Sequence, residues 1–291
     1  MSKLENVLDS GEFVLTCELN PPKGTDLAAL FDKADRLKGL IDAFNLTDSH
    51  AARMAMAPLA VAHLLLDRGV EPILQTTTRD RNRIALQGDL LGASALGVEN
   101  VVFMGGDPPS NGDHPDAKPV FDVYSSLMLK AASDLEKGKD MAGNPISGAP
   151  HFCIGAVANP GARDLDEEIM RMGEKIDAGA RFFQTQAVYD AHTFERFARA
   201  AEQYPVPILA GIIPMKSVQQ ANYMNAHVPG IHVPDTVIAE LDRAEDKIST
   251  GIDIAARTIK HLDGMCRGLH VMAIGLEAHI PALLQKAGIE R

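Results

Sequence analysis

The chain has 291 residues, 46% of them hydrophobic, which is enough for a sizeable core and fits an α/β barrel of about 250 residues with additions. Its net charge of −11 argues against nucleic acid or an anionic membrane surface as the main partner. Three distant cysteines (Cys17, Cys153 and Cys266) form no disulfide or metal pattern, and the sequence shows neither a signal segment nor a run of about 20 apolar residues. We therefore expect a cytoplasmic protein without a metal site.

Short apolar runs alternate with amphipathic segments of helical length along the chain. The apolar runs predict eight strands, at 13–18, 43–47, 71–76, 101–104, 151–156, 182–186, 208–212 and 269–272. Each is followed by a predicted helix, at 26–40, 58–68, 79–96, 123–137, 165–178, 191–203, 216–225 and 277–286. This alternation predicts the α/β fold class and a (β/α)8 TIM barrel, as a single domain over residues 1–291. An open doubly wound sheet is the alternative.

Two insertions interrupt the repeat. Residues 108–119 form a turn-rich loop after the fourth predicted strand, and residues 235–258 have the pattern of an extra helix before the eighth. In a parallel barrel the loops that follow strands lie on the catalytic face, so we expect the first insertion there.

The most informative position is Glu18. An apolar, β-branched run ends on this carboxylate, and Pro21-Pro22 turns the chain directly afterwards. Because the carboxyl ends of barrel strands form the catalytic face, Glu18 is a candidate proton donor.

Polar residues also end most other predicted strands, which indicates a binding cavity lined with hydrogen-bonding groups. They are Thr47 and Asp48 after the second strand, Gln75 to Thr78 on the third, Asp107 after the fourth, Asn159 after the fifth, and Gln184 and Gln186 on the sixth. For Asp48, a role in ordering its loop is as well supported as a role in ligand binding. Asp107 follows Gly105-Gly106, where the backbone can approach a ligand closely, so we favour a functional role for it.

Several other polar positions have structural explanations. Thr78 is a candidate cap for the helix after the third strand, and the arginines at 79 and 81 are poorly matched to a helix N-terminus, so they should have tertiary partners. We interpret His63 and His270 as structural residues.

Five segments occur together in one order: CELNPP at 17–22, RDRN at 79–82, LLGASALGVENVVFMGGDPP at 90–109, KIDAGARFFQTQ at 175–186 and GIIP at 211–214. With them the chain resembles the methylenetetrahydrofolate reductase family, in its short prokaryotic form with the catalytic barrel alone. The similarity runs from about residue 10 to about residue 280.

The resemblance implies a barrel that holds a flavin, usually FAD, and works in one-carbon metabolism and methionine biosynthesis. NAD(P)H would reduce the flavin, and the reduced flavin would convert 5,10-methylenetetrahydrofolate to 5-methyltetrahydrofolate. Glu18 matches the general acid that protonates the leaving nitrogen of the folate. Since a glutamate ordinarily has a pKa of about 4.3, this role requires burial or flavin contact to raise it.

Other site residues follow from the resemblance one by one. Asp107 matches a catalytic acid that binds folate and tunes the flavin, and Gln186 matches a folate ligand. Thr47, Gln75 and Gly106 fall at flavin-contacting strand ends, while Glu168 and Lys175 match helix positions on the phosphate and ribose side of the flavin. The implied partners are a tetrahydrofolate derivative and a pyridine nucleotide, and a homo-oligomer is expected.

The chain departs from the family pattern at four places. Gln75, Gly105 and Val218 stand where His, Arg and an aromatic residue are common, and the loop at Asn159 lacks the Tyr and His that bind FAD. These departures leave open FAD, FMN, a loosely held flavin or direct hydride transfer without flavin. A pterin-binding methyltransferase and a non-catalytic subunit are further alternatives. The chain lacks the Cys/His zinc cluster that a methyl acceptor site would use, and a non-catalytic subunit would have no need of Glu18.

Overall fold

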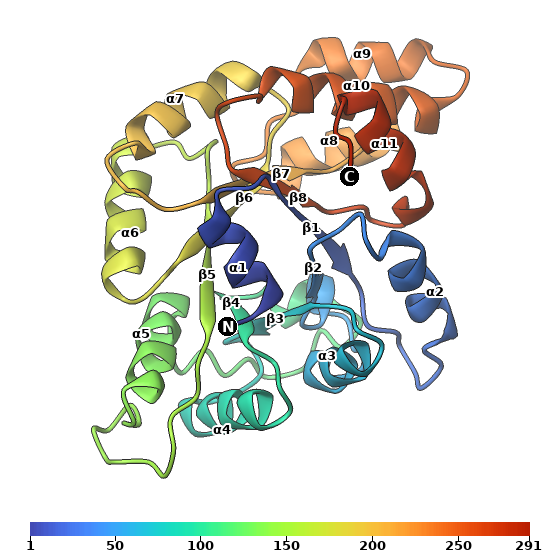
Figure 1. The fold of residues 1–291 in the computed structure, drawn as a ribbon. Coiled ribbons are helices and arrows are strands. Elements are labelled where there is room, and N and C mark those ends of the chain that lie inside the picture. The colour runs from blue at the N-terminus through green and yellow to red at the C-terminus, as the bar shows by residue number, and fades with distance from the viewer.

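The computed structural model describes residues 1–291 and contains eight parallel strands that close into a barrel in sequential order (Figure 1). The strands are β1 (Val14–Leu19), β2 (Ala43–Leu46), β3 (Pro72–Thr77), β4 (Asn100–Met104), β5 (Cys153–Ala158), β6 (Phe182–Ala187), β7 (Ile208–Ile212) and β8 (Gly268–Val271). Because β1 pairs with both β2 and β8, the sheet has no free edge. The predicted TIM barrel is confirmed, and the open doubly wound sheet is excluded.

Helices surround the barrel on its outer side (Figure 1). Those that follow the strands are α2 (Ala28–Leu37), α3 (Pro58–Asp67), α4 (Arg83–Ala95), α5 (Ser125–Glu136), α6 (Leu165–Asp177), α7 (Ala191–Ala201), α8 (Val218–His227) and α11 (Ile280–Ala287). The predicted insertion before β8 forms two helices, α9 (Asp235–Arg243) and α10 (Lys247–His261), with Asp246 capping the second. No helix has the length and apolar character needed to cross a membrane.

The start of α4 differs from the sequence prediction. The helix begins at Arg83 rather than at residue 79, because the Asn82 side chain accepts hydrogen bonds from the backbone amides of Ile84 and Ala85. Asn82, not Thr78, is therefore the cap. Residues 78–82 form a connecting loop whose arginine side chains reach other parts of the barrel.

Alternate residues of each strand face the barrel interior, as the two-residue period of a strand requires. At the amino ends of the strands this interior is apolar: a cluster of Val14, Ala43, Ile73, Val102, Cys153, Phe182 and Leu209 fills it. Two residues further along the strands the interior becomes polar. Gly155 on β5 packs against the Phe182 ring of the apolar cluster, and a side chain at this position would come within 2.4 Å of that ring.

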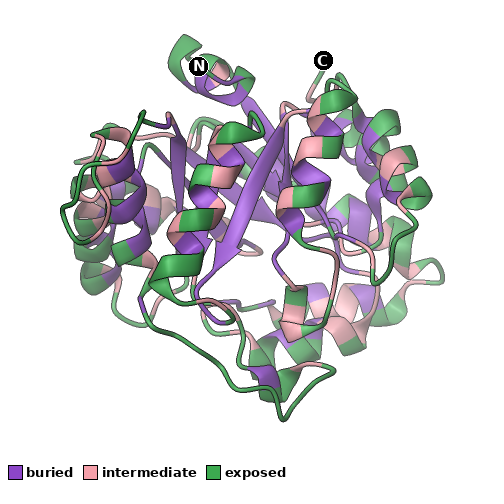
Figure 2. Ribbon diagram, turned by 90° about the horizontal axis from the view of Figure 1, so that it is seen from below, coloured by how far each residue is buried: buried purple, intermediate pink, exposed green.

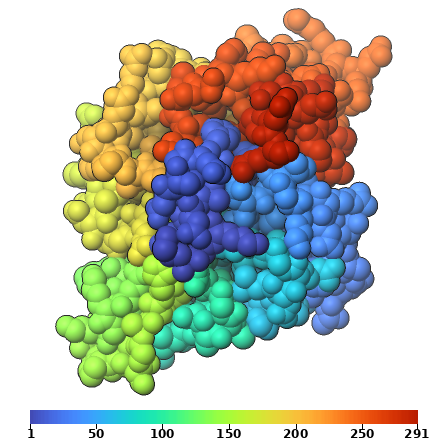
Figure 3. Space-filling view, viewed as in Figure 1, coloured from blue at the N-terminus to red at the C-terminus, as the bar shows by residue number.

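An additional helix, α1 (Lys3–Ser10), closes the amino end of the barrel (Figure 1). Leu4 and Leu8 pack onto the apolar interior cluster, and the space-filling view shows α1 seated over the barrel between its neighbours (Figure 3). Figure 2 shows this helix at one end of the buried strands, near both termini, with the loops that follow the strands at the opposite end. Any ligand site inside the barrel must therefore open at the carboxyl ends of the strands.

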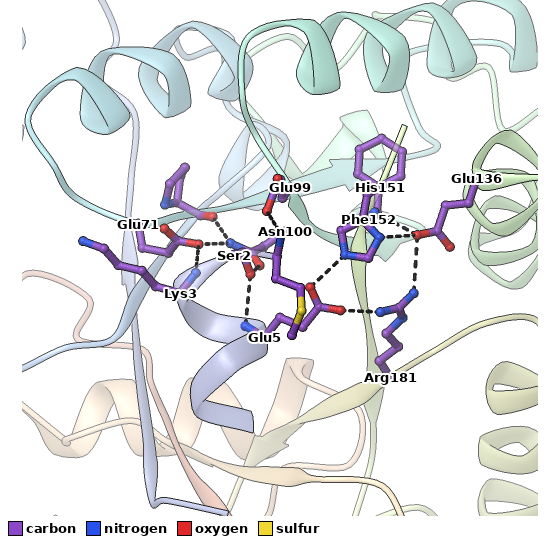
Figure 4. Close-up of polar contacts among 12 residues, drawn as sticks. Ser2, Lys3, Glu5, Glu71, Glu99, Asn100, Glu136, His151, Phe152 and Arg181 are labelled. Atoms are coloured by element: carbon purple, nitrogen blue, oxygen red, sulfur yellow. Dashed lines mark hydrogen bonds and ion pairs between the residues drawn. The ribbon is translucent and has the colours of Figure 1, made fainter. Parts of the chain in front are cut away.

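Polar contacts fix α1 in place (Figure 4). The Glu5 carboxylate is buried and pairs with Arg181 and with His151, whose Nε2 lies 2.8 Å from Glu5 Oε2. Ser2 donates to Asn100 Oδ1 at 2.6 Å, which anchors the start of the helix to β4. These contacts tie α1 to β4 and to the segments just before β5 and β6.

We predict that Glu5→Ala lowers the free energy of unfolding by about 2 kcal/mol, because Arg181 and His151 lose their buried partner. The loss stays moderate because Arg181 is still partly solvated. Chemical denaturation monitored by circular dichroism measures the change. Asp9→Ala, on the exposed side of the same helix, is the control and should change stability by less than about 0.5 kcal/mol. Equal losses in the two variants would contradict the anchoring role of Glu5.

Candidate functional site

A polar layer lies inside the barrel above the apolar cluster. It consists of side chains that alternate with the apolar residues along the strands: Thr16 and Glu18 on β1, Asn45 on β2, Gln75 on β3, Gln184 on β6 and His270 on β8. Strand pairing places Glu18 beside Asn45 and Thr16 beside His270. Glu18 therefore stands at the top of a buried polar network and not on the surface.

Two side chains contact the Glu18 carboxylate directly. Gln75 Nε2 donates to Glu18 Oε1 at 3.0 Å, and His270 Nε2 lies 3.6 Å from the same oxygen. The Glu18 side chain is 16% exposed and that of His270 is 5% exposed, so the contact is largely shielded from water. The carboxylate is thus held by neighbours from two other strands.

The two ring nitrogens of His270 face different partners. Nε2 faces the Glu18 carboxylate, which in its ionised form can only accept hydrogen bonds. Nδ1 lies 3.0 Å from the Thr16 hydroxyl, which also donates to the Leu269 carbonyl at 3.3 Å. Gln184 donates to Thr16 Oγ1 at 3.1 Å and exchanges two hydrogen bonds with Asn45, of 2.8 and 2.9 Å. The network thus runs from Glu18 across the barrel interior.

These neighbours set the charge of Glu18. Burial by itself raises the pKa of the carboxyl group, but the His270 ring and the Gln75 amide stabilise the carboxylate more strongly, so the pKa lies below its ordinary value. A general acid would need a raised pKa here, and the protein alone lowers it. Glu18 is therefore ionised at neutral pH when no ligand is bound.

Charged residues behind the barrel mouth hold the loops in place. Asp48 accepts hydrogen bonds from the Thr77 amide and hydroxyl, at 2.8 and 2.9 Å, and pairs with Arg81. Arg79, only 3% exposed, pairs with Asp80 and donates to the carbonyl of Asp107 at 3.3 Å. The predicted tertiary partners of both arginines are confirmed, and Asp48 orders its loop.

Four of the expected ligand-binding residues surround the same mouth. Asp107 and Gln186 follow or end their strands with side chains that make no hydrogen bond within the chain, and Asp107 is exposed. Gly106 has the left-handed φ of 87° that turns the chain toward Asp107. Thr47 is buried and donates to Asn20 at 2.8 Å. Asp107 and Gln186 therefore have polar groups available to a ligand.

Glu168 and Lys175 lie apart from that group, on α6. Glu168 accepts from the Asn159 amide at 3.0 Å, and Lys175 Nζ donates to the Val157 carbonyl at 2.7 Å. Burial lowers the pKa of Lys175, with the nearby Glu168 charge acting in the opposite direction. Glu168 also lines a cavity of about 550 Å3 between the β5–α6 loop and the segment after α8. In this structure both side chains hold the end of β5.

Sequence reasoning missed the network below Glu18. His270 was assigned a structural role, whereas it faces the interior and contacts the acid; Asn45 was not considered. A signal was present, because Thr16 and Glu18, Asn45 and Thr47, and Gln184 and Gln186 are each spaced by two residues in otherwise apolar strands. Across the chain, no group of three or more His, Cys, Asp or Glu side chains is placed to hold a metal ion.

The fold resembles solved structures at low sequence identity. A protein from Clostridium thermocellum, described as binding two copies of 5-methyl-5,6,7,8-tetrahydrofolic acid, aligns with a TM-score of 0.68 at 18% identity, over 98% of this chain and 97% of that one. A 2,3-dimethylmalate lyase aligns with a TM-score of 0.54 at 10% identity, over 99% of this chain and 85% of that one. These similarities support the barrel fold.

Sequence comparison gives closer information. A Schizosaccharomyces pombe protein named methylenetetrahydrofolate reductase 2 is 23% identical over 99% of this chain, and a Pectobacterium carotovorum 5,10-methylenetetrahydrofolate reductase is 25% identical over 87% of it. The chain spans about half the length of the eukaryotic relative and 82% of the bacterial one. Residues 3–288 match the family described as methylenetetrahydrofolate reductase. The chain belongs to the methylenetetrahydrofolate reductase family.

Proposed function

We propose that this protein interconverts 5,10-methylenetetrahydrofolate and 5-methyltetrahydrofolate with a pyridine nucleotide as the hydride partner, and that Glu18 moves the proton. The observation that carries the proposal is the Glu18 carboxylate at the carboxyl end of β1, shielded and held by Gln75 and His270. The family match supports the reaction, and relatives named for NADPH and for NADH support the hydride partner. A cytoplasmic location and a homo-oligomer stay predictions from the sequence.

The ionisation of Glu18 bears on the direction of the proton. Opening the methylene-bridged ring requires a proton on the leaving nitrogen, so Glu18 must take up a proton before it acts as the acid. A bound pterin that excludes water from the mouth would raise the pKa of Glu18 and favour its protonated form. In the reverse direction the ionised carboxylate is already the form that accepts the proton. The resting state of the site thus suits the oxidation of the methyl group.

A flavin is the cofactor that the family implies, and it would supply the hydride-carrying ring. We propose that Thr47, Gln75 and Gly106 line its position, because all three lie at the carboxyl ends of β2, β3 and β4 around the mouth. Lys175 would have to give up its hydrogen bond to Val157, and Glu168 its bond to Asn159, to hold the phosphate side. Binding on the phosphate side therefore requires Lys175 and Glu168 to exchange their protein partners for the ligand.

Within this arrangement the residues of the chain have separate roles. We propose that Asp107 and Gln186 bind the pterin, since their polar groups have no partner within the chain. Gln75 and His270 orient Glu18 toward the mouth and stabilise its charged form. Asn45 and Gln184 act one step further away, because they hold Thr16 and, through it, the His270 ring.

The two half-reactions test the function. We expect anaerobic NADH to bleach the visible spectrum of the flavin-loaded protein, and 5,10-methylenetetrahydrofolate to restore it. In Glu18→Gln the first step should be almost unchanged, while the second should slow by about 10²–10⁴-fold through loss of the proton donor. Stopped-flow absorbance separates the two rates.

The outcomes distinguish the alternatives. An equal loss of both half-reactions in Glu18→Gln would refute the acid assignment. If the protein binds no added flavin but still oxidises NADH when folate is present, the hydride passes directly from the nucleotide to the folate without a flavin. If the protein transfers the methyl group of 5-methyltetrahydrofolate to a thiol or corrinoid without any nucleotide, it is a methyltransferase and not an oxidoreductase.

Asp107→Asn should weaken folate binding by about ten- to a hundredfold, because a charge-assisted hydrogen bond to the ligand is replaced by a neutral one. It should also raise the reduction potential of the bound flavin, since a nearby carboxylate disfavours the anionic reduced ring. Folate titration and redox-dye equilibration measure the two effects. An unchanged potential would place Asp107 away from the flavin ring.

His270→Gln should raise the pKa of Glu18, because it removes the first of the contacts that offset burial. In the unmodified protein the lowered pKa means that ionised Glu18 stabilises the fold above pH 4.5, and that this contribution is lost as the pH falls through the lowered pKa. Carbon-13 NMR of labelled glutamate carboxyl groups follows the titration. His192→Gln, on the exposed side of α7, is the control, and a Glu18 pKa that moved in neither variant would exclude His270 as its positioning residue.

A further inference from the structure

A second cavity lies at the carboxyl end of the barrel, with Asn20, two residues after Glu18, in its lining. It has a volume of about 590 Å3 and lies among the loops that follow β1, β2 and β4. Asn20 and Thr47 form its inner wall, and each directly follows a strand of the barrel. His50, on the same wall, is close enough that its charge helps to lower the pKa of Glu18. A ligand with one end at Glu18 can therefore extend into this cavity.

The lining is basic although the chain as a whole carries a net charge of −11. Lys23, His50 and Arg53 contribute three basic side chains, and Asp113 contributes one carboxylate. Asp113 already pairs with Lys23 and accepts from the Met54 amide at 3.0 Å, and these contacts lower its pKa to about 2. His50 and Arg53 make no side-chain hydrogen bond or ion pair within the chain. Arg53 thus brings to the cavity a positive charge that no protein group pairs with, and the His50 ring beside it has no protein partner.

The loop that carries these groups is held in an unfavourable conformation. Ser49, Ala51 and Ala52 have φ values of 52°, 52° and 55°, in the left-handed region that residues with a side chain rarely adopt. Each such residue costs about 1–3 kcal/mol and persists only where its surroundings enforce it. The opposite loop packs closely against this turn, since a side chain at Gly112 would lie 1.8 Å from the Ala52 carbonyl oxygen. His50 and Arg53 therefore project from a turn whose backbone is packed against a second loop.

From these observations we infer that the cavity at Lys23, His50 and Arg53 binds the polyanionic end of a ligand whose reacting end lies at Glu18. This inference rests on the proposed function and names a subsite of it. Two substrates of the reaction have such an end: the glutamyl carboxylates of a folate, and the phosphates of a pyridine nucleotide. Both are anions that an arginine binds through two hydrogen bonds.

Removal of one unpaired charge tests the subsite. Arg53→Gln is compared with Arg199→Gln, an equal charge change on the exposed side of α7. Isothermal titration calorimetry measures the affinity of each variant for 5-methyltetrahydrofolate with one and with three glutamyl residues, and for NADPH. We expect Arg53→Gln to lose about tenfold in affinity for either the triglutamate or the nucleotide, with a smaller dependence of that affinity on salt, and Arg199→Gln to match the unmodified protein.

The ligand that loses affinity identifies the occupant. A loss for the triglutamate that exceeds the loss for the monoglutamate assigns the cavity to the folate tail, and a loss for NADPH alone assigns it to the nucleotide phosphates. Equal affinities in Arg53→Gln and Arg199→Gln for all three ligands would overturn the subsite and leave the proposed function intact. Failure of the unmodified protein to bind any folate would instead overturn the proposed function.

Discussion

The two-residue period of a closed parallel barrel controls the chemistry of this protein. Because alternate side chains of every strand point inward, Glu18, Gln75 and His270 meet from three strands that are far apart in the sequence. The same period gives the layer below an apolar filling, onto which α1 packs. The barrel is thus closed at its amino end and polar toward its carboxyl end, which leaves one face for ligands.

The balance of forces on Glu18 connects this architecture to function. Burial opposes ionisation, while the imidazole of His270 and the amide of Gln75 favour it, and the second effect prevails. A site of this kind changes state when a ligand alters the balance, since exclusion of water strengthens the burial effect. Gln75 and His270 are both neutral hydrogen-bonding side chains when the imidazole is unprotonated, so an amide and a ring share the control of the acid.

Around this centre the loops differ in rigidity and in purpose. The Asp48–Arg81 ion pair joins the ends of β2 and β3, and Arg79 donates to the Asp107 carbonyl after β4. The left-handed residues Ser49, Ala51 and Ala52 and the close contact at Gly112 shape the loops around the basic cavity. Asp107 and Gln186, by contrast, keep their polar groups free, which is the arrangement expected of residues that meet a ligand.

Patterns in the sequence are enough to predict the barrel and the place of Glu18, because strand and helix periods are local and the carboxyl ends of parallel strands must share one face. The polar strand ends also pointed to Asp107 and Gln186, and the segments that resemble the family added their expected roles and the flavin-side positions. Which strand residues meet across the interior depends on how the barrel closes, and this closure brings His270 to Glu18. Packing of α6 against β5 likewise places Lys175 on a backbone carbonyl. The pKa of Glu18 is also set by the folded structure, since it depends on the distances between charges on different strands, which no local pattern encodes.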